Sequence, residues 1–314
     1  MLDIRKAAII GCGFVGSTTA FSLMQTGLFS QLVLIDANPA RAHGEAMDLS
    51  HGLPFAHPMK IYAGSYDDIH DCALIIITAG AAQRPGETRL ELVHRNVAIF
   101  RSIIPEIVRH NREAVLLIVS NPVDVLTYAA LKLSGFPPNR VLGSGTVLDT
   151  ARLKYLLSEH LQVDSRSVHA FIIGEHGDSE LAVWSGANVS GVALDHFCEL
   201  RGHFDHPAAT ERIYREVRDS AYDIIARKGA TYYGVAMAVT RIALSIVRDE
   251  HSVLPVSCLV QERYGIPDLC LSLPAVVGRS GVETVLDLSL SPPEQSNLLQ
   301  AAQTLRGIIN TLEL

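Results

Sequence analysis

Cysteine is scarce in this chain of 314 residues, and its arrangement excludes a disulfide scaffold. The cysteines are odd in number, widely spaced and without a CxxC pair: Cys12, Cys72, Cys198, Cys258 and Cys270. Small secreted proteins that depend on disulfides carry a much denser, usually even set. The pattern is typical of reduced thiols, which favours a cytoplasmic location.

Charged residues and long apolar runs are also few. Only 19% of the residues are charged, and 26 basic residues against 33 acidic ones give a net charge of −7 at pH 7. Proteins that bind nucleic acid through phosphate contacts normally show the opposite balance, so we expect no nucleic acid partner. No uncharged apolar run approaches the roughly 18 residues of a membrane span, so we expect no membrane association. At about 150 residues per domain, the length suggests two domains or one large one.

The first half of the chain alternates short apolar runs with helical patterns. Strands are predicted at residues 7–11, 32–36, 60–63, 74–79, 115–120 and 140–143, and helices at 15–26, 40–49, 89–109 and 123–134. Continuous Ile, Leu and Val runs separated by helices indicate strands that are covered on both faces. We therefore predict an α/β domain over residues 1–145, with a doubly wound parallel sheet of the Rossmann type that binds ligands at the carboxyl ends of its strands.

After residue 145 this alternation ends. Helices are predicted at 148–161, 208–227, 231–248 and 293–312, and strands at 168–173, 253–260 and 269–277. Strands and helices that come in blocks are typical of an α+β architecture. We therefore predict an α+β substrate-binding and catalytic domain over residues 146–314, close to the first domain, with a cleft between the two.

A glycine-rich turn follows the first predicted strand and opens the first predicted helix. Gly11, Gly13 and Gly16 form the pattern GxGxxG, which allows a tight turn, close approach of the backbone to a pyrophosphate, and close packing of helix on sheet. The helix N-terminus favours the phosphate charge. The next strand ends in Asp36, where an acid accepts hydrogen bonds from the ribose hydroxyls and repels a 2′-phosphate. The pattern therefore indicates NAD rather than NADP as the cofactor.

Polar groups follow the predicted strands of both halves. Asn121 and Asp124 come after the fifth strand, and His176 comes after the strand at 168–173. Asp149 and Arg152 share one face of a predicted helix. Singly, these are ordinary loop residues or a surface ion pair. Together, behind a nucleotide-binding turn, they indicate transfer of a hydride and a proton between NAD and a small 2-hydroxy acid, because a histidine exchanges protons and an arginine binds a carboxylate through two bonds.

The chain resembles the lactate/malate dehydrogenase family, in particular its bacterial members, over nearly its whole length. The motifs that match are GCGFVG (11–16), QRPGETR (83–89), SNPVD (120–124), LDTAR (148–152), GEHGD (174–178) and KGATYYG (228–234). The resemblance implies an NAD-dependent oxidoreductase that interconverts a 2-oxo acid and a 2-hydroxy acid.

The resemblance also implies roles for individual residues. His176 is the acid–base group at the C2 oxygen of the substrate, Asp149 orients it, and Arg89 polarises the C2 carbonyl after a loop closes. Substrate contacts are implied for Gln83, Arg89, Asn121, Asp124, Asp149, Arg152 and Thr231. Cofactor contacts are implied for Gly11, Gly13, Val15, Gly16, Asp36, Arg41, Tyr66, Gly80, Ala81, Ser102, Asn121 and Ser144. A cis Asn121-Pro122 bond is implied as well, and no metal site is predicted.

The choice of oxo acid depends on position 83. Malate dehydrogenases of the family place an arginine there for the second carboxylate of oxaloacetate, whereas the neutral Gln83 suits the methyl group of pyruvate. Glu87 adds negative charge to the same loop and further disfavours a dianion. Arg84 would become the selecting residue if the loop were shifted by one position, but the spacing from Gln83 to Arg89 matches the family. We predict the reversible reduction of pyruvate by NADH to L-lactate and NAD⁺, the fermentative step after glycolysis.

An effector site is a further implication of the resemblance. Many bacterial relatives are activated by fructose 1,6-bisphosphate, which an arginine and a histidine hold across a subunit interface. His169 matches the histidine, but Lys154 replaces the arginine and lacks its bidentate fork. We expect weakened or altered activation; the alternative is a pair of ordinary interface residues in a constitutively active enzyme. A site shared between subunits implies a homotetramer.

Other interpretations remain open on the sequence alone. A malate dehydrogenase would differ in its rates with pyruvate and oxaloacetate. An NAD- and manganese-dependent glycosidase has a similar fold but uses a Cys/His metal site, and no cysteine lies beside Asn121 or His176. A non-catalytic NAD-binding protein would not need a proton donor beside a carboxylate-binding arginine. The segment from Asp195 to His206 contains zinc-ligand residue types without a known spacing, so we interpret it as an exposed surface loop.

Overall fold

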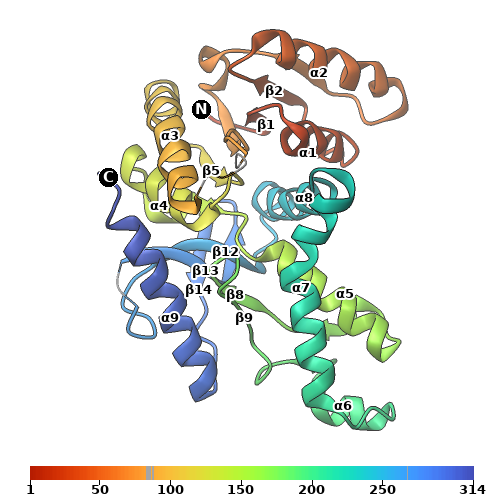
Figure 1. Cartoon of the computed structure of the whole chain (residues 1–314). Coiled ribbons are helices and arrows are strands. Elements are labelled where there is room, and N and C mark those ends of the chain that lie inside the picture. The colour runs from red at the N-terminus through yellow and green to blue at the C-terminus, as the bar shows by residue number, and fades with distance from the viewer. Residues whose placement is uncertain (83–85, 87, 267) are drawn as a thin grey trace.

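The computed structural model describes residues 1–82, 86, 88–266 and 268–314 (Figure 1). Its main sheet has 11 strands in the order β3-β2-β1-β4-β5-β6-β12-β13-β8-β9, with β14 paired to β13. The parallel strands are β1 (Asp3–Ile10), β2 (Gln31–Ile35), β3 (Lys60–Ala63), β4 (Cys72–Ile77), β5 (Val115–Ile118) and β6 (Val141–Gly143). The order 3-2-1-4-5-6 is that of dinucleotide-binding folds, which confirms the predicted doubly wound sheet.

Antiparallel strands continue this sheet into the second half of the chain. They are β8 (Ile172–Gly174), β9 (Glu180–Ala182), β12 (Ser252–Val260), β13 (Leu269–Gly278) and β14 (Gly281–Val285). β12 pairs with β6 through Ser257 and Gly143. The strand direction thus changes just after β6, while the hydrogen-bonded sheet is continuous between the two halves.

Helices cover both faces of the parallel strands. The helices are α1 (Phe14–Met24), α2 (Pro39–Gly52), α3 (Arg89–His110), α4 (Val123–Ser134), α5 (Val147–Leu161), α8 (Tyr233–Arg248) and α9 (Pro292–Ile309). In β1, Ala7 and Ile9 join the core formed with α1, α2 and α8, whereas Ala8 and Ile10 join the core formed with α3, α4 and α9. Alternate residues of a strand point to opposite faces, so a strand buried on both faces reads as a continuous apolar run.

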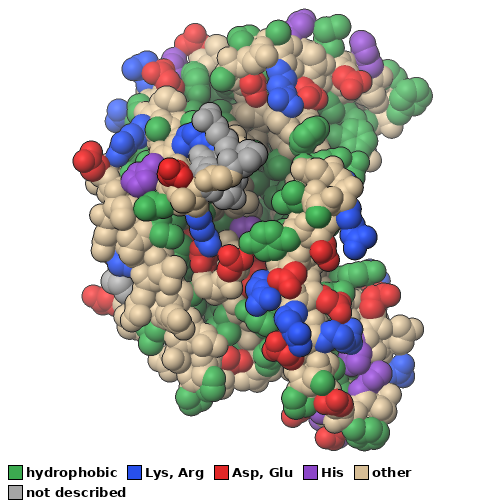
Figure 2. Space-filling model, in the orientation of Figure 1, with side chains coloured by type: hydrophobic (Ala, Val, Ile, Leu, Met, Phe, Trp, Pro, Cys, Tyr) green, Lys and Arg blue, Asp and Glu red, His purple; other side chains and the backbone are tan. Residues whose placement is uncertain are grey.

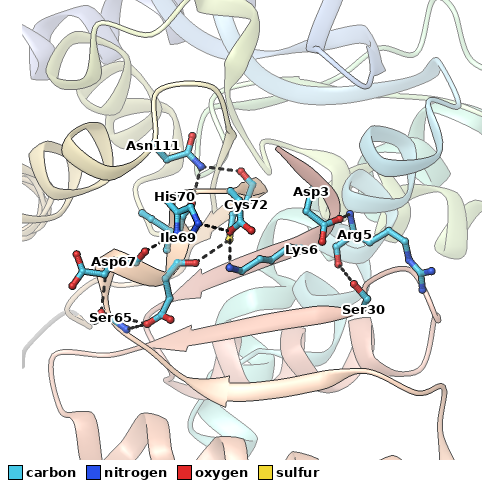
Figure 3. A network of polar contacts seen from close by, with 12 residues as sticks. Asp3, Arg5, Lys6, Ser30, Ser65, Asp67, Ile69, His70, Cys72 and Asn111 are labelled. Carbon is cyan, nitrogen blue, oxygen red and sulfur yellow. Dashed lines mark hydrogen bonds and ion pairs between the residues drawn. The ribbon is translucent and has the colours of Figure 1, made fainter. Parts of the chain in front are cut away.

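A buried polar network fixes the amino-terminal ends of β1 and β4 (Figure 3). Lys6 is only 5% exposed, and its Nζ donates a hydrogen bond to Asp71 Oδ1 at 2.6 Å. Asn111, directly after α3, donates from Nδ2 to the carbonyl oxygens of Ile69 and Cys72 at 2.7 and 2.9 Å. These bonds hold β1 and the end of α3 to the chain that enters β4. These contacts therefore help to fix the position of β1 relative to β4, whose carboxyl ends are expected to bind ligands.

The second half differs from the sequence prediction in two places. The strand expected at 168–173 is divided into β7 (Val168–His169) and β8, and β7 belongs to a separate sheet with β10 (Asn188–Val189) and β11 (Val192–Ala193). The exposed loop expected from Asp195 to His206 overlaps helix α6 (Leu194–Leu200) and ends at the start of α7 (His206–Lys228). Leu194 and Cys198 of α6 are buried, because four-residue spacing places them on one helix face against a third core cluster.

Short 3₁₀ helices complete the described elements: Leu53–Phe55, Tyr66–Ile69, Pro138–Arg140 and Ser165–Ser167. Among the described residues, no helix combines the length and the apolar character that crossing a membrane requires.

Candidate active site

The glycine turn joins β1 to α1 at the point where the strand order reverses. Gly11 has φ +101°, and a Cβ atom on it would lie 2.5 Å from the backbone nitrogen of Ala79, after β4. A Cβ atom on Gly16 would lie 1.9 Å from the carbonyl oxygen of Gly11. Both positions therefore require glycine, and the turn is packed tightly between β1, β4 and α1.

Gly13 and Asp36 form the part of this turn that faces outward. Among the described residues, a Cβ atom on Gly13 would meet nothing within 4 Å, and no side chain caps the first turn of α1, whose N–H groups lack intrahelical partners. Asp36 accepts the backbone N–H groups of Cys12 and Asn38 at 2.7 and 2.8 Å, which fixes its carboxylate beside the turn. Open space at a helix N-terminus and an anchored carboxylate fit the pyrophosphate and the ribose of NAD.

We expect Gly16→Ala to lower the affinity for NADH by about tenfold or more, because the added methyl group would displace the Gly11 carbonyl and reshape the turn. A fluorescence titration with NADH measures this change. Gly44→Ala is the matched control, since a Cβ atom there meets nothing within 4 Å and the residue lies in α2. If Gly16→Ala binds NADH as tightly as Gly44→Ala does, the turn is not the cofactor site.

Asn96 of α3 connects two segments that the sequence predicts to contact the cofactor. Its Oδ1 accepts the backbone N–H of Ala81 at 2.8 Å, and its Nδ2 donates to the carbonyl oxygen of Asn121 at 2.8 Å. The residue is 1% exposed, so both bonds are shielded from water. Asn96 thus holds the segment after β4, with Gly80 and Ala81, against the segment after β5. The sequence analysis missed it, although a polar residue on the apolar face of a helix was a usable signal.

The other predicted cofactor residues are more dispersed. Ser144 is buried directly after β6. Val15 is half-buried in the first turn of α1, Tyr66 is half-buried against the core beside α3, and Arg41 is exposed on α2. Ser102 is exposed in the middle of α3, about 20 Å along the helix axis from its first residue. In the described part of the chain no hydrogen bond joins Ser102 to the glycine turn, so its role stays a prediction.

Three predicted site residues form a connected chain of polar side chains. His176 Nδ1 lies 2.5 Å from Asp149 Oδ2, and Arg152 Nη1 donates to Asp149 Oδ1 at 2.9 Å. Asp149 is 1% exposed. The first turns of α5 present Asp149 and Arg152 on one face, and the turn after β8 brings His176 to them. Because Nδ1 faces the carboxylate, it holds the N–H of that bond, and Nε2 is left to exchange a proton.

The charges of this chain shift the pKa values of its members. Burial alone would lower the pKa of His176, but the charge and hydrogen bond of Asp149 outweigh it and raise the pKa to about 9. Burial alone would raise the pKa of Asp149, but the charges of His176 and Arg152 and the bond to His176 lower it. At neutral pH the imidazole is therefore protonated and ready to act as an acid.

Asp124 and Asn121 belong to the segment that follows β5. Asp124, in the first turn of α4, is 1% exposed, and burial raises its pKa to about 6. Its Oδ2 accepts the backbone N–H of His176 at 2.7 Å, and its Oδ1 accepts the Ser272 hydroxyl at 3.4 Å. Asp124 thus lies behind the His176 backbone rather than in the open site. The Asn121-Pro122 bond is cis, as the resemblance implies.

Arg89, the first residue of α3, reaches toward the turn that carries His176. Its Nη2 donates to Glu175 Oε1, and its Nη1 lies 3.8 Å from Asp178 Oδ2. Glu175 is 2% exposed, and Tyr222 of α7 donates to Asp178 Oδ1 at 2.8 Å. Glu175 and Asp178 belong to the GEHGD motif, but the sequence analysis gave them no role, and nothing in the pattern of α7 distinguishes Tyr222 from an ordinary surface tyrosine.

A cavity of about 400 Å³, here called the His176 cavity, collects these groups. Its walls include the predicted residues Arg89, Asn121, Asp149, Arg152 and His176. Thr231 is half-buried and does not line the cavity, and Gln83 lies outside the described residues.

Helix α7 supplies a wall of the His176 cavity that the sequence analysis missed. Arg218, Tyr222 and Ile225 line the cavity from this helix. Figure 2 shows side chains of both charges gathered along α7, whose outer surface forms the ion pairs Arg212–Glu216, Arg215–Glu211 and Arg218–Asp219. An amphipathic pattern predicts that one face of a helix is buried, but not which site it covers.

Two further groups bear on the sequence predictions. Lys154 is half-buried in α5, which lowers its pKa, and His169 is exposed in β7, which packs against α5.

Within the described ranges, one group of three residues could hold a metal ion: the ligand atoms of Asp249, His251 and Glu283 lie within 4.8 Å of one another. This group lies outside the His176 cavity, and a hydrogen bond of 2.8 Å from His251 Nδ1 to Glu283 Oε2 already pairs two of its members.

Comparisons with known proteins give matches over nearly the whole chain. The lactate/malate dehydrogenase NAD binding domain matches residues 5–143, and the lactate/malate dehydrogenase alpha/beta C-terminal domain matches residues 146–313. The L-lactate dehydrogenase of Acetivibrio thermocellus is 52% identical over 311 residues, which cover 99% of this chain and 98% of that protein. L-lactate dehydrogenase 1 of Clostridium acetobutylicum is 50% identical over 307 residues, 98% of each chain. The crystal structure of the minor L-lactate dehydrogenase of Enterococcus mundtii in the ligands-bound form has a TM-score of 0.96 at 40% identity, with 99% of both chains covered. This chain therefore belongs to the lactate/malate dehydrogenase family of NAD-dependent oxidoreductases.

Proposed function

We propose that this chain is an L-lactate dehydrogenase, which interconverts pyruvate and L-lactate with NADH and NAD⁺ in the fermentative step after glycolysis. The observation that supports this most directly is the Arg152–Asp149–His176 chain, in which one buried carboxylate holds both a guanidinium and a protonated imidazole in a single cavity. A guanidinium suits the carboxylate of the substrate, and an imidazolium suits its C2 oxygen. The printed names of the relatives described above point to the same activity.

In the proposed reaction, each residue acts at a defined atom. Arg152 uses Nη1 toward Asp149, and its remaining N–H groups bind the substrate carboxylate. His176 donates its Nε2 proton to the C2 oxygen in pyruvate reduction and takes it back in lactate oxidation. Arg89 leaves its contact with Glu175 to stabilise negative charge at the same oxygen. The glycine turn and Asp36 hold NADH, which supplies a hydride to C2 when it is bound.

We propose Gln83 as the residue that selects pyruvate. Initial rates of NADH oxidation with pyruvate and with oxaloacetate test this, and we expect kcat/KM for pyruvate to be about 100-fold higher, because a second carboxylate finds no cationic partner at this position. Gln83→Arg should shift the ratio toward oxaloacetate. Faster turnover of oxaloacetate by the wild type would identify a malate dehydrogenase. An unchanged ratio in Gln83→Arg would make another residue, with Arg84 the first candidate, the selector.

We further propose a homotetramer in which Lys154 and His169 bind fructose 1,6-bisphosphate with weakened effect. In support, Lys154 is half-buried and burial lowers its pKa. A lysine in this position therefore loses its positive charge more readily than an arginine would. The rate measurements above, repeated with the bisphosphate at neutral pH, test this: an unchanged KM for pyruvate would end the effector proposal. A cytoplasmic location and domains over residues 1–145 and 146–314 complete the proposal. All described cysteines are free, and the strand direction changes after β6.

A further inference from the structure

Glu180 of β9 is a carboxyl group of the His176 cavity that the proposed reaction does not use. It is only 5% exposed, and its buried Oε1 has no hydrogen-bond partner among the residues that the structure describes. Burying an unpartnered carboxylate is far more costly than burying the neutral acid, so the protonated form is the one that this position favours. Among the charged groups of the cavity, burial of Oε1 therefore favours Glu180 as the neutral carboxylic acid.

Charged and titratable groups face Glu180 from each element packed around it. They are Arg89 on α3, Asp149 and Arg152 on α5, Glu175, His176 and Asp178 beside the turn from β8 to β9, Glu211, Tyr214 and Arg218 on α7, and Glu294 on α9. Burial and the negative charge of Asp149 raise the pKa of Glu180 to about 8, against the opposing charges of His176, Arg152 and Arg218. The group therefore changes charge in the same pH range in which the His176 cavity must bind an anion.

The charge balance of the cavity shows what this change would do. Arg152 and protonated His176 share a single carboxylate, that of Asp149, so the three groups together have a net charge of +1. One monocarboxylate balances that charge. An ionised Glu180 would add a negative charge to the same cavity and repel a carboxylate substrate, whether His176 is protonated or neutral.

We propose that Glu180 must be a neutral acid for the His176 cavity to bind a carboxylate substrate, so that its ionisation sets the upper pH limit of substrate affinity. This inference rests on the proposed lactate dehydrogenase function and adds an affinity-determining residue to it. Glu180 takes no part in proton transfer to the substrate, and kcat is expected to change little when it is replaced.

The test measures KM for L-lactate with saturating NAD⁺ in the wild type and in Glu180→Gln. Lactate is the better substrate for this purpose, because it binds to neutral His176; rising pH therefore improves binding through His176 and weakens it through Glu180. We expect equal KM values at pH about 6.5. At pH about 9.5 the wild-type KM should be about 30-fold higher than that of the variant, since only a small fraction of the wild type then retains neutral Glu180.

Two matched variants separate this effect from packing. Glu211→Gln removes an exposed carboxylate of α7 that lines a neighbouring cavity of about 590 Å³ but not the His176 cavity, and its KM should follow the wild type at every pH. Glu180→Asp keeps a titrating carboxyl group. The ratio of its KM for L-lactate to that of Glu180→Gln should therefore still rise at alkaline pH.

The outcomes are distinct. A KM ratio between wild type and Glu180→Gln that is independent of pH would overturn the proposal and leave Glu180 a packing residue. If Glu180→Gln does not fold, calorimetry of lactate binding to the wild-type NADH complex, which cannot oxidise lactate, decides at pH about 9.5 in buffers of different ionisation enthalpy: net proton uptake supports the proposal, and its absence overturns it. A wild type that oxidises no lactate would instead refute the proposed function.

Discussion

A His176→Ala variant is expected to lose about 10³- to 10⁴-fold in kcat for pyruvate reduction while keeping NADH affinity within about twofold of the wild type. The imidazole is a protonated group of the cavity, its Nε2 is not engaged by Asp149, and alanine offers no donor in its place. The cofactor side depends on the glycine turn and Asp36, which make no hydrogen bond to His176 in the described part of the chain. Single-turnover NADH oxidation gives the first quantity, and a fluorescence titration gives the second.

If His176 is the proton donor, the rate of pyruvate reduction should depend on pH in a defined direction. Pyruvate reduction requires protonated His176, so kcat at saturating pyruvate should be maintained below a pH of about 9 and fall as the pH rises through that value. His176→Ala should lack this fall. His196→Ala is the control, since His196 is an exposed residue beside Glu199 on α6 and should leave the profile unchanged. A residual rate within about tenfold of the wild type would mean that a different group donates the proton.

Much of the candidate site follows from local sequence because its parts are local. The glycine turn needs Gly11 and Gly16 for contacts within a single strand–turn–helix unit, and the four-residue segment from Asp149 to Arg152 aligns two side chains on one helix face. The rule that parallel strands present their ligand-binding groups at their carboxyl ends then places Asp36 and Asn121. Each of these predictions required only the spacing of side chains within one helix or strand and the sequence of the adjacent turn.

The residues that the sequence analysis missed depend on contacts between distant segments. Glu180 becomes a cavity residue because β9 pairs with β8 beside α5, and Tyr222 because α7 packs over the turn after β8. Hydrophobic periodicity predicts a buried face but not the element that it meets. The same reason explains α6: its short apolar pattern, Leu194 and Cys198, is too brief to distinguish a helix from a loop until the core it contacts is known.

An Arg152→Gln variant is expected to raise KM for pyruvate by about 10²- to 10³-fold, with a smaller decrease in kcat. Removing one partner of a desolvated charge pair costs about 2–5 kcal/mol, and Arg152 would bind the substrate carboxylate in a cavity where its side chain is already largely shielded. His176 keeps its bond to Asp149 in this variant, so its proton remains available and the chemical step is less affected than binding.

Arg152→Lys separates charge from geometry in the same experiment. Lysine keeps the positive charge but not the planar fork, so its KM should lie between those of the wild type and Arg152→Gln. Steady-state kinetics with pyruvate at a pH of about 7, well below the pKa of His176, provides KM and kcat separately. If kcat falls while KM stays constant in both variants, Arg152 acts only in the transition state. The Arg152–Asp149–His176 chain would then orient the imidazole without holding the substrate, and the carboxylate-binding group would have to be sought in Arg218, which lines the cavity from α7.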